Sequence, residues 1–138
     1  MSGRLPRVAL FAVDTFTAVT AIGGGLALAA GLERDRFPTA WLDGTPFASY
    51  VAPGLLLAGA VGGTAASAAV ASVRAPRAGG RASIVAGTVL ASWVVGEILV
   101  LAKDDEVVSP TEVTYLAVAA AMVTLGVAVA RGAHALRP

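Results

Sequence analysis

Hydrophobic and polar positions fall into long blocks along this chain rather than into short alternating runs. Four blocks are apolar: Val8–Leu32, Pro46–Val73, Ala82–Ala102 and Val113–Ala130. Together they contain two acidic side chains, Asp14 and Glu97, and no basic one. A helix needs about 20 apolar residues to cross the hydrocarbon core of a bilayer. The pattern predicts an all-α polytopic membrane protein, a four-transmembrane-helix bundle with helices at approximately 8–32, 46–73, 82–102 and 113–131, and residues 1–138 as a single membrane domain.

The first block also has features of a secretory signal peptide. Arg4 and Arg7 precede it, and Ala27-Leu28-Ala29 resembles a small-residue cleavage site. The apolar stretch is too long for a signal peptide, however, and Asp14 interrupts it. We therefore expect a retained transmembrane helix.

The charges of the connecting segments predict the orientation. Acids are absent before the first block, between the second and third, and after the fourth. These segments carry the arginines Arg4, Arg7, Arg74, Arg77, Arg81, Arg131 and Arg137. The acidic residues gather in the other two loops and at the next helix start: Glu33, Asp35, Asp43, Asp104, Asp105, Glu106 and Glu112. Short cytoplasmic loops are enriched in Lys and Arg, so we expect both termini in the cytoplasm and the acidic loops outside.

Local signals mark the ends of the helices. Thr45 and Ser109 each precede a proline, the arrangement of an N-cap followed by proline at the first helical position. Glu112 stands three residues after Ser109, where it closes a capping box. Pro53 is expected to bend the second helix about two turns from its start. The loop and helix start around residues 34–50 carry rings suited to the headgroup level, and we expect an interfacial or re-entrant turn there: Phe37, Trp41, Phe47 and Tyr50.

Small residues at four-residue spacing mark packing faces on every predicted helix. Helices in lipid approach each other closely where such residues line up. The rows are centred on Gly25, Gly59, Gly63 and Gly87, and the row of Gly87 includes Ser83 and Ala91. We expect these rows to pack inside the bundle, with a dimerisation face as the alternative for the Gly59/Gly63 pair.

Asp14 is the first of two carboxyls inside the predicted membrane segments. An intramembrane charge costs roughly 2.5–3.5 kcal/mol on insertion scales and marks a functional site by default. Thr17, Ala18, Ala21 and Gly25 share its face at helical spacing. We therefore expect Asp14 to point into the bundle and to accept a hydrogen bond from a serine or threonine hydroxyl. A structural role and a role in proton or ligand binding both remain open for Asp14 and Thr17.

Glu97, the second carboxyl, has bulky helical neighbours that include Trp93. Its face is expected to turn away from the small-residue row of its helix, about 7 Å from the outer end. Three roles stay open: lining an outward-facing cavity with Trp93, contacting another subunit, or reaching to the surface. Asp14 and Glu97 are expected to differ in depth by roughly 13 Å, which leaves room for a relay but not for a paired-carboxylate active site.

Composition narrows the chemistry further. The chain is 57% hydrophobic and 14% charged, with a mean hydropathy of +0.78. The lack of cysteine excludes disulfides, iron–sulfur clusters and thiolate zinc sites. The single histidine, His134, lies outside the apolar blocks and argues against a bis-histidine haem. Asp104, Asp105 and Glu106 match no calcium loop and are expected to be solvated. We expect no metal, no cofactor, no catalytic residue set and no nucleic-acid partner.

The middle of the chain carries a further pattern, made up of Phe37-Pro38, Trp41-Leu42, Thr45-Pro46-Phe47, Tyr50, Pro53-Gly54-Leu55, Gly62-Gly63, Gly87, Leu90, Trp93 and Glu97. It resembles a family of small four-helix membrane proteins of actinobacteria and related bacteria, to which no activity is assigned. The resemblance implies a four-helix fold and a location in the bacterial plasma (inner) membrane. It gives Trp93 and Glu97 no catalytic role.

Three functions are compatible with these features. The short loops favour a non-enzymatic membrane component, an accessory subunit or small oligomer in a larger membrane complex, with Asp14 and Glu97 serving packing or partner contacts. The alternative is a proton- or cation-coupled transporter or channel that uses the same two residues. A more remote alternative is an intramembrane enzyme acting on a lipid or isoprenoid, with a neutral carboxyl as proton donor.

Overall fold

The computed structural model describes residues 4–33, 35, 37–101 and 109–135. The helices are α1 (Arg4–Ala29), the 3₁₀ turn η1 (Thr39–Leu42), α2 (Val51–Leu56), the π-helical segment η2 (Leu57–Gly62), α3 (Gly63–Arg74), α4 (Pro76–Leu101) and α5 (Pro110–Ala135). The described residues form no β-strand. This confirms the all-α four-helix bundle, because α2, η2 and α3 follow one another without a break and form one rod.

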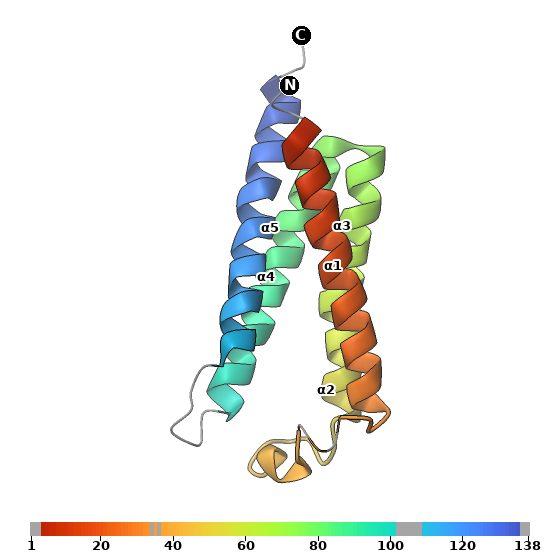
Figure 1. Cartoon of the computed structure of the whole chain (residues 1–138), viewed down its shortest axis with the longest axis vertical. Coiled ribbons are helices and arrows are strands. Elements are labelled where there is room, and N and C mark those ends of the chain that lie inside the picture. Colours follow the sequence, from red (N-terminus) through yellow and green to blue (C-terminus); the bar gives the residue numbers. More distant parts are fainter. Residues whose placement is uncertain (1–3, 34, 36, 102–108, 136–138) are drawn as a thin grey trace.

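The bundle consists of two helix pairs (Figure 1). α1 lies along the α2–η2–α3 rod, and α4 lies along α5, the most extensive helix contact in the molecule. α3 packs against α4 and joins the pairs at the end where α1 begins and α5 ends. Toward the other end the two pairs diverge. The core between the pairs is mostly alanine with a few larger side chains, among them Val61, Leu90 and Met122.

All four rods are long and apolar enough to cross a membrane. The candidate spans are Arg4–Ala29, Val51–Arg74, Pro76–Leu99 and Pro110–Gly132. Large hydrophobic side chains cover their outer faces; Leu5 and Leu99, for example, are each 76% exposed. A water-soluble bundle would bury such side chains, whereas in lipid there is no hydrophobic driving force to bury them.

The turn between α3 and α4 is shorter than the sequence predicts. Only Ala75 separates the two helices, so Arg77 and Arg81 belong to the first two turns of α4 and not to a loop. Pro76 explains the early start, because its fixed φ and missing N–H suit the first helical position. The predicted start at residue 82 was wrong because the helix begins before the apolar block, with Arg77 and Arg81 already helical.

The predicted N-cap at Thr45 was also wrong. The rod begins at Val51 with Tyr50 as N-cap, and the Thr45 hydroxyl donates instead to the Leu42 carbonyl within the loop. Pro53 consequently lies in the first helical turn, where no intrahelical hydrogen bond is lost. The irregularity comes later, in the π-helical segment Leu57–Gly62.

α5 begins where the sequence predicts a cap. Its first residue is Pro110, and the Glu112 carboxylate accepts hydrogen bonds from both the backbone N–H (2.8 Å) and the hydroxyl of Ser109. The acidic half of the capping box is thus confirmed. The serine half differs, because the Ser109 hydroxyl bonds to Glu112 and not to a backbone N–H.

The loop before α2 folds onto itself through its aromatic rings. Phe37 meets Trp41 and Tyr50 edge-to-face, each at a centroid distance of 6.1 Å. The Tyr50 hydroxyl donates to the Pro38 carbonyl at 3.0 Å. The loop is therefore a compact turn at one end of the bundle, held by rings that suit the headgroup level.

Glycines set the closest helix contacts, but only some of the predicted ones do so. A Cβ at Gly54 would lie 2.5 Å from the Gly25 carbonyl oxygen, and one at Gly87 would lie 2.9 Å from the Ala119 carbonyl oxygen. At Gly59 and Gly63 no such atom lies within 4 Å. The prediction that this pair packs inside the bundle was wrong within this chain. The neighbouring row of the α2–η2–α3 rod, which includes Gly54, packs against α1 instead.

Candidate functional site

The buried face of α1 carries two polar residues in its middle. Asp14 and Thr17 are both 0% exposed and lie on the same face as Ala18, Ala21 and Gly25. This is the small-residue face predicted from helical spacing, and the structure confirms its burial. The carboxyl of Asp14 therefore lies inside the bundle and not against lipid.

Asp14 is bonded to the neighbouring helix α4. The Ser83 hydroxyl, also fully buried, donates to Asp14 Oδ2 at 2.5 Å. This is a hydroxyl partner of the kind that the sequence predicts. The second carboxylate oxygen, Oδ1, is buried and has no hydrogen-bond partner. A buried acceptor without a partner costs free energy. Only one of the two carboxylate oxygens of Asp14 therefore has a hydrogen-bond donor in the bundle.

The Thr17 hydroxyl is used elsewhere. It donates to the Val13 carbonyl at 2.9 Å and lies 3.6 Å from the Met122 sulfur of α5. Thr17 thus links α1 to α5, whereas Asp14 links α1 to α4. Beside them, the Thr15 hydroxyl is buried without a partner. Asp14 and Thr17 thus give the middle of α1 polar contacts in two directions.

Glu97 lies toward the opposite end of α4. It continues the row of Ser83, Leu90 and Val94, which faces the bundle interior. The expectation that Glu97 turns away from Ser83 was therefore wrong; the two differ by nearly four helical turns along one face. Glu97 is partly buried, and the Trp93 indole donates a side-chain hydrogen bond to its carboxylate.

The aromatic loop brings a third group near Glu97. Burial, and next the negative charge of Glu97, raise the pKa of the Tyr50 hydroxyl above its ordinary value. The Glu112 carboxylate at the start of α5 is also close enough to interact with Glu97 electrostatically. Glu97 is therefore the centre of a small group at the loop end of the bundle, made from α4, α5 and the loop.

Asp14 and Glu97 do not form one site. The partner of Asp14 is Ser83, which precedes Glu97 by 14 positions, so the two carboxyls lie about 21 Å apart along α4 at 1.5 Å per residue. Their separation exceeds the predicted 13 Å because that prediction counted depth from Arg7 and Arg81 as if the two were level, whereas the hydrogen bond places Asp14 level with Ser83. The buried side chains between them are apolar, with Ala86, Leu90 and Val94 on α4 and Val61 on the rod.

Both intramembrane carboxyls accept hydrogen bonds from neutral donors. Among the described residues Asp14 is bonded to the Ser83 hydroxyl and Glu97 to the Trp93 indole, and no group of three or more potential metal ligands occurs there. The acidic loop residues Asp104, Asp105 and Glu106, which were expected to be solvated, lie outside the described residues. Asp14 Oδ1, which has no hydrogen-bond partner, can accept a proton or a hydrogen bond.

The sequence did not predict two of the contacts between helices. Ser83 was recognised as a small packing residue but not as the partner of Asp14, which needed the register of α1 against α4. Arg131 was assigned to topology alone, yet the structure brings it beside Arg77 and Arg81. Only the pairing of α4 with α5 reveals that cluster.

Comparisons with known proteins found no counterpart: no protein-family model, no curated protein and no solved structure matches this chain. The fold itself defines the class. Four helices long and apolar enough to span a bilayer, with a polar contact buried between them, are the features of a multi-pass helical membrane protein.

Proposed function

We propose that this chain is a non-enzymatic component of a bacterial plasma membrane, an accessory subunit or small oligomer whose two intramembrane carboxyls serve helix and partner contacts. The observation that carries the proposal is the Ser83–Asp14 hydrogen bond. It joins α1 to α4 across the bundle, from two side chains with no exposed surface. Interhelical hydrogen bonds of this kind hold transmembrane helices in register.

Glu97 supports the partner half of the proposal. It is only partly buried, and it lies with Trp93, Tyr50 and Glu112 at the loop end of the bundle. Aromatic rings around a hydrogen-bonded carboxylate are suited to contact a second protein, because they provide apolar area and a polar group together.

The distribution of charge supports an orientation with both termini in the cytoplasm. The arginines of α1, α3, α4 and α5 lie at the end where α1 begins and α5 ends, whereas Glu33, Asp43 and Glu112 belong to the opposite end. This is the asymmetry expected when the arginine-rich end is cytoplasmic.

A proton- or cation-coupled transporter is the second candidate, and one observation favours it. Asp14 Oδ1 is buried without a partner and could receive a proton or cation. Against it stands the apolar packing of Leu90, Val94 and Val61 between Asp14 and Glu97, which provides no polar path between the two carboxyls.

One set of proteins tests both candidates: wild type, Asp14→Asn, Glu97→Gln and, as a matched control, Asp35→Asn at an exposed loop carboxyl. Native mass spectrometry should show wild type with a second copy or a co-purifying partner, and Glu97→Gln without it. In proteoliposomes under a pH gradient, wild type should show no more flux than empty vesicles. A monomeric wild type with no partner would contradict the assembly role, and flux that Asp14→Asn abolishes would establish transport instead.

A further inference from the structure

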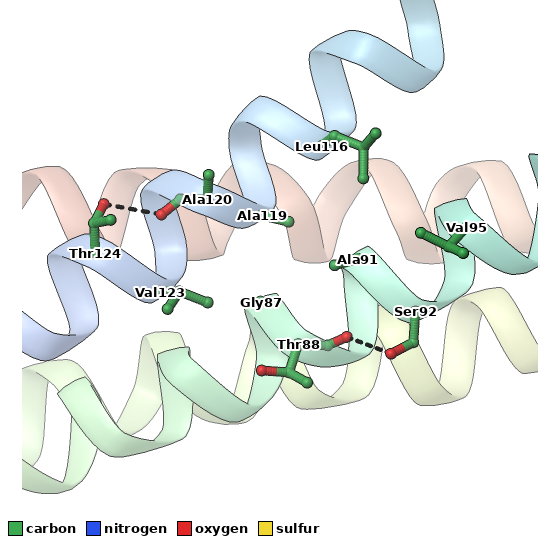
Figure 2. Close-up of a pocket in the computed structure, with 10 residues that line it drawn as sticks. All are labelled: Gly87, Thr88, Ala91, Ser92, Val95, Leu116, Ala119, Ala120, Val123 and Thr124. Atoms are coloured by element: carbon green, nitrogen blue, oxygen red, sulfur yellow. Dashed lines mark hydrogen bonds between the residues drawn. The ribbon is translucent and has the colours of Figure 1, made fainter. Parts of the chain in front are cut away.

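The seam between α4 and α5 has two hollows on its lipid-facing side. The first, of about 270 Å³, is lined by Arg77, Arg81, Ala130 and Arg131 at the arginine-rich end. The second, of about 590 Å³, lies further along the same two helices (Figure 2). Neither hollow includes Asp14 or Glu97, so the seam is separate from the site described above.

The arginine hollow gathers three positive charges without a compensating acid. Arg77 and Arg81 are one turn apart on α4, and Arg131 comes from the last turns of α5. The two backbones approach closely just there, because a Cβ at Gly80 would lie 2.6 Å from the Gly126 carbonyl oxygen. Within the described residues none of these arginines forms an ion pair. Three like charges so placed repel one another, and an anion between them would relieve the repulsion.

The second hollow is an apolar groove. Figure 2 shows small side chains from both helices along it, among them Gly87 and Ala91 of α4 and Ala120 of α5. Its hydroxyls are turned to their own helices: Ser92 donates to the Thr88 carbonyl and Thr124 to the Ala120 carbonyl, each within hydrogen-bond distance. The groove therefore presents hydrocarbon and not hydrogen-bonding groups to an occupant.

Both hollows lie on one face of the helix pair. Arg81, Thr88 and Ser92 follow one another on α4 at spacings of seven and four residues, all exposed. Arg131 and Thr124 repeat the seven-residue spacing on α5. A molecule with an anionic head and an apolar tail could thus occupy the arginine hollow and the groove at the same time.

We propose that the α4–α5 seam binds an anionic phospholipid of the leaflet at the arginine-rich end, with its phosphate in the arginine hollow and one acyl chain in the groove. The charges of the hollow match the phosphate, and basic hollows between transmembrane helices are suited to such headgroups.

The dimensions fit one leaflet. Half of the hydrocarbon core is about 15 Å deep, which corresponds to about ten residues of helix, from Arg81 to Ala91. The groove begins at Gly87, about 9 Å from Arg81 on the same scale. An acyl chain attached to a phosphate at the arginines would therefore reach the groove within its own leaflet.

Native mass spectrometry of the full chain with added phosphatidylglycerol tests the proposal. Neutralising Arg77→Gln and Arg81→Gln together should weaken binding on the order of 25-fold, about fivefold for each charge. The matched control is Arg74→Gln, an exposed arginine at the same end that does not line the hollow, and it should leave binding within about twofold. Lysine at positions 77 and 81 should retain most of the binding, because the charge remains.

The groove has its own variant. Ala120→Phe fills it from an exposed position and should weaken phosphatidylglycerol binding several-fold, whereas Ala12→Phe on the exposed face of α1 should not. An equal loss in Arg74→Gln, equal binding of zwitterionic phosphatidylcholine, or unchanged binding in Ala120→Phe would overturn the proposal. Full competition by inorganic phosphate would assign the hollow to a free anion and would overturn it as well. Melting temperatures of all variants confirm that each one folds.

Discussion

Asp14 shows how one residue changes character with its surroundings. On an isolated helix in lipid, its charge would cost roughly 2.5–3.5 kcal/mol on insertion scales. In the bundle it is fully buried and accepts a hydrogen bond from Ser83, so the same group becomes a link between α1 and α4. Hydrogen bonds between transmembrane helices contribute about 0.6 kcal/mol on average and up to about 1.7 kcal/mol. The link is therefore useful but modest.

The Asp14 link makes a first prediction. Ser83→Ala removes the donor and leaves both Asp14 oxygens without a partner, so the free energy of unfolding should fall by about 1–2 kcal/mol. Ser92→Ala is the control on the same helix, because its exposed hydroxyl donates only to the Thr88 carbonyl. Reversible unfolding in mixed detergent measures both. Equal stability of the two variants would show that the Ser83 contact contributes nothing.

At the scale of helices, close approach depends on which glycine faces a neighbour. Gly25 and Gly54 bring α1 and α2 into backbone contact, and Gly80 and Gly126 do the same for α4 and α5. Without a hydrophobic driving force in lipid, such contacts supply the van der Waals energy that holds the helices together. Glycines facing outward lack that role, and their identity matters little to the bundle.

Neighbouring glycines on α1 test this difference. Gly25→Ala places a methyl group against the α2 backbone and should destabilise the bundle by about 1–3 kcal/mol, the usual range for overpacking. Gly24→Ala meets nothing within 4 Å and should be neutral or slightly stabilising, because alanine favours a helix over glycine. Thermal unfolding in detergent compares them directly. If Gly24→Ala proved as harmful as Gly25→Ala, the register of α1 against α2 would be wrong.

At the scale of the whole molecule, the two ends differ in charge and in structure. One end joins α3 to α4 through the single residue Ala75 and carries the arginines. The opposite end carries the aromatic loop, where Phe37, Trp41 and Tyr50 contact one another. The helix pairs pack closely at the first end and diverge toward the second (Figure 1). Charge and packing thus distinguish the ends independently.

The absence of native cysteine allows a clean test of orientation. Single cysteines at Ala75, in the α3–α4 turn, and at Ala48, in the aromatic loop, both occupy exposed positions. A membrane-impermeant maleimide applied to intact cells should label Ala48→Cys and leave Ala75→Cys unlabelled until the membrane is opened. Labelling of both variants from the same side would contradict a bundle that crosses the bilayer four times.

The sequence determined the four membrane segments and the burial of the Asp14 face. Segment length and apolar periodicity are local properties, and they set whether a helix can span the bilayer and which residues share one face. The sequence did not determine the partner of Asp14 or the role of Gly59 and Gly63. Those depend on the register and rotation of one helix against another, which in lipid are set by van der Waals contact between neighbouring surfaces. A single helix carries no information about which row meets a neighbour, so only the tertiary structure decided that Ser83 meets Asp14 and that Arg131 lies beside Arg81.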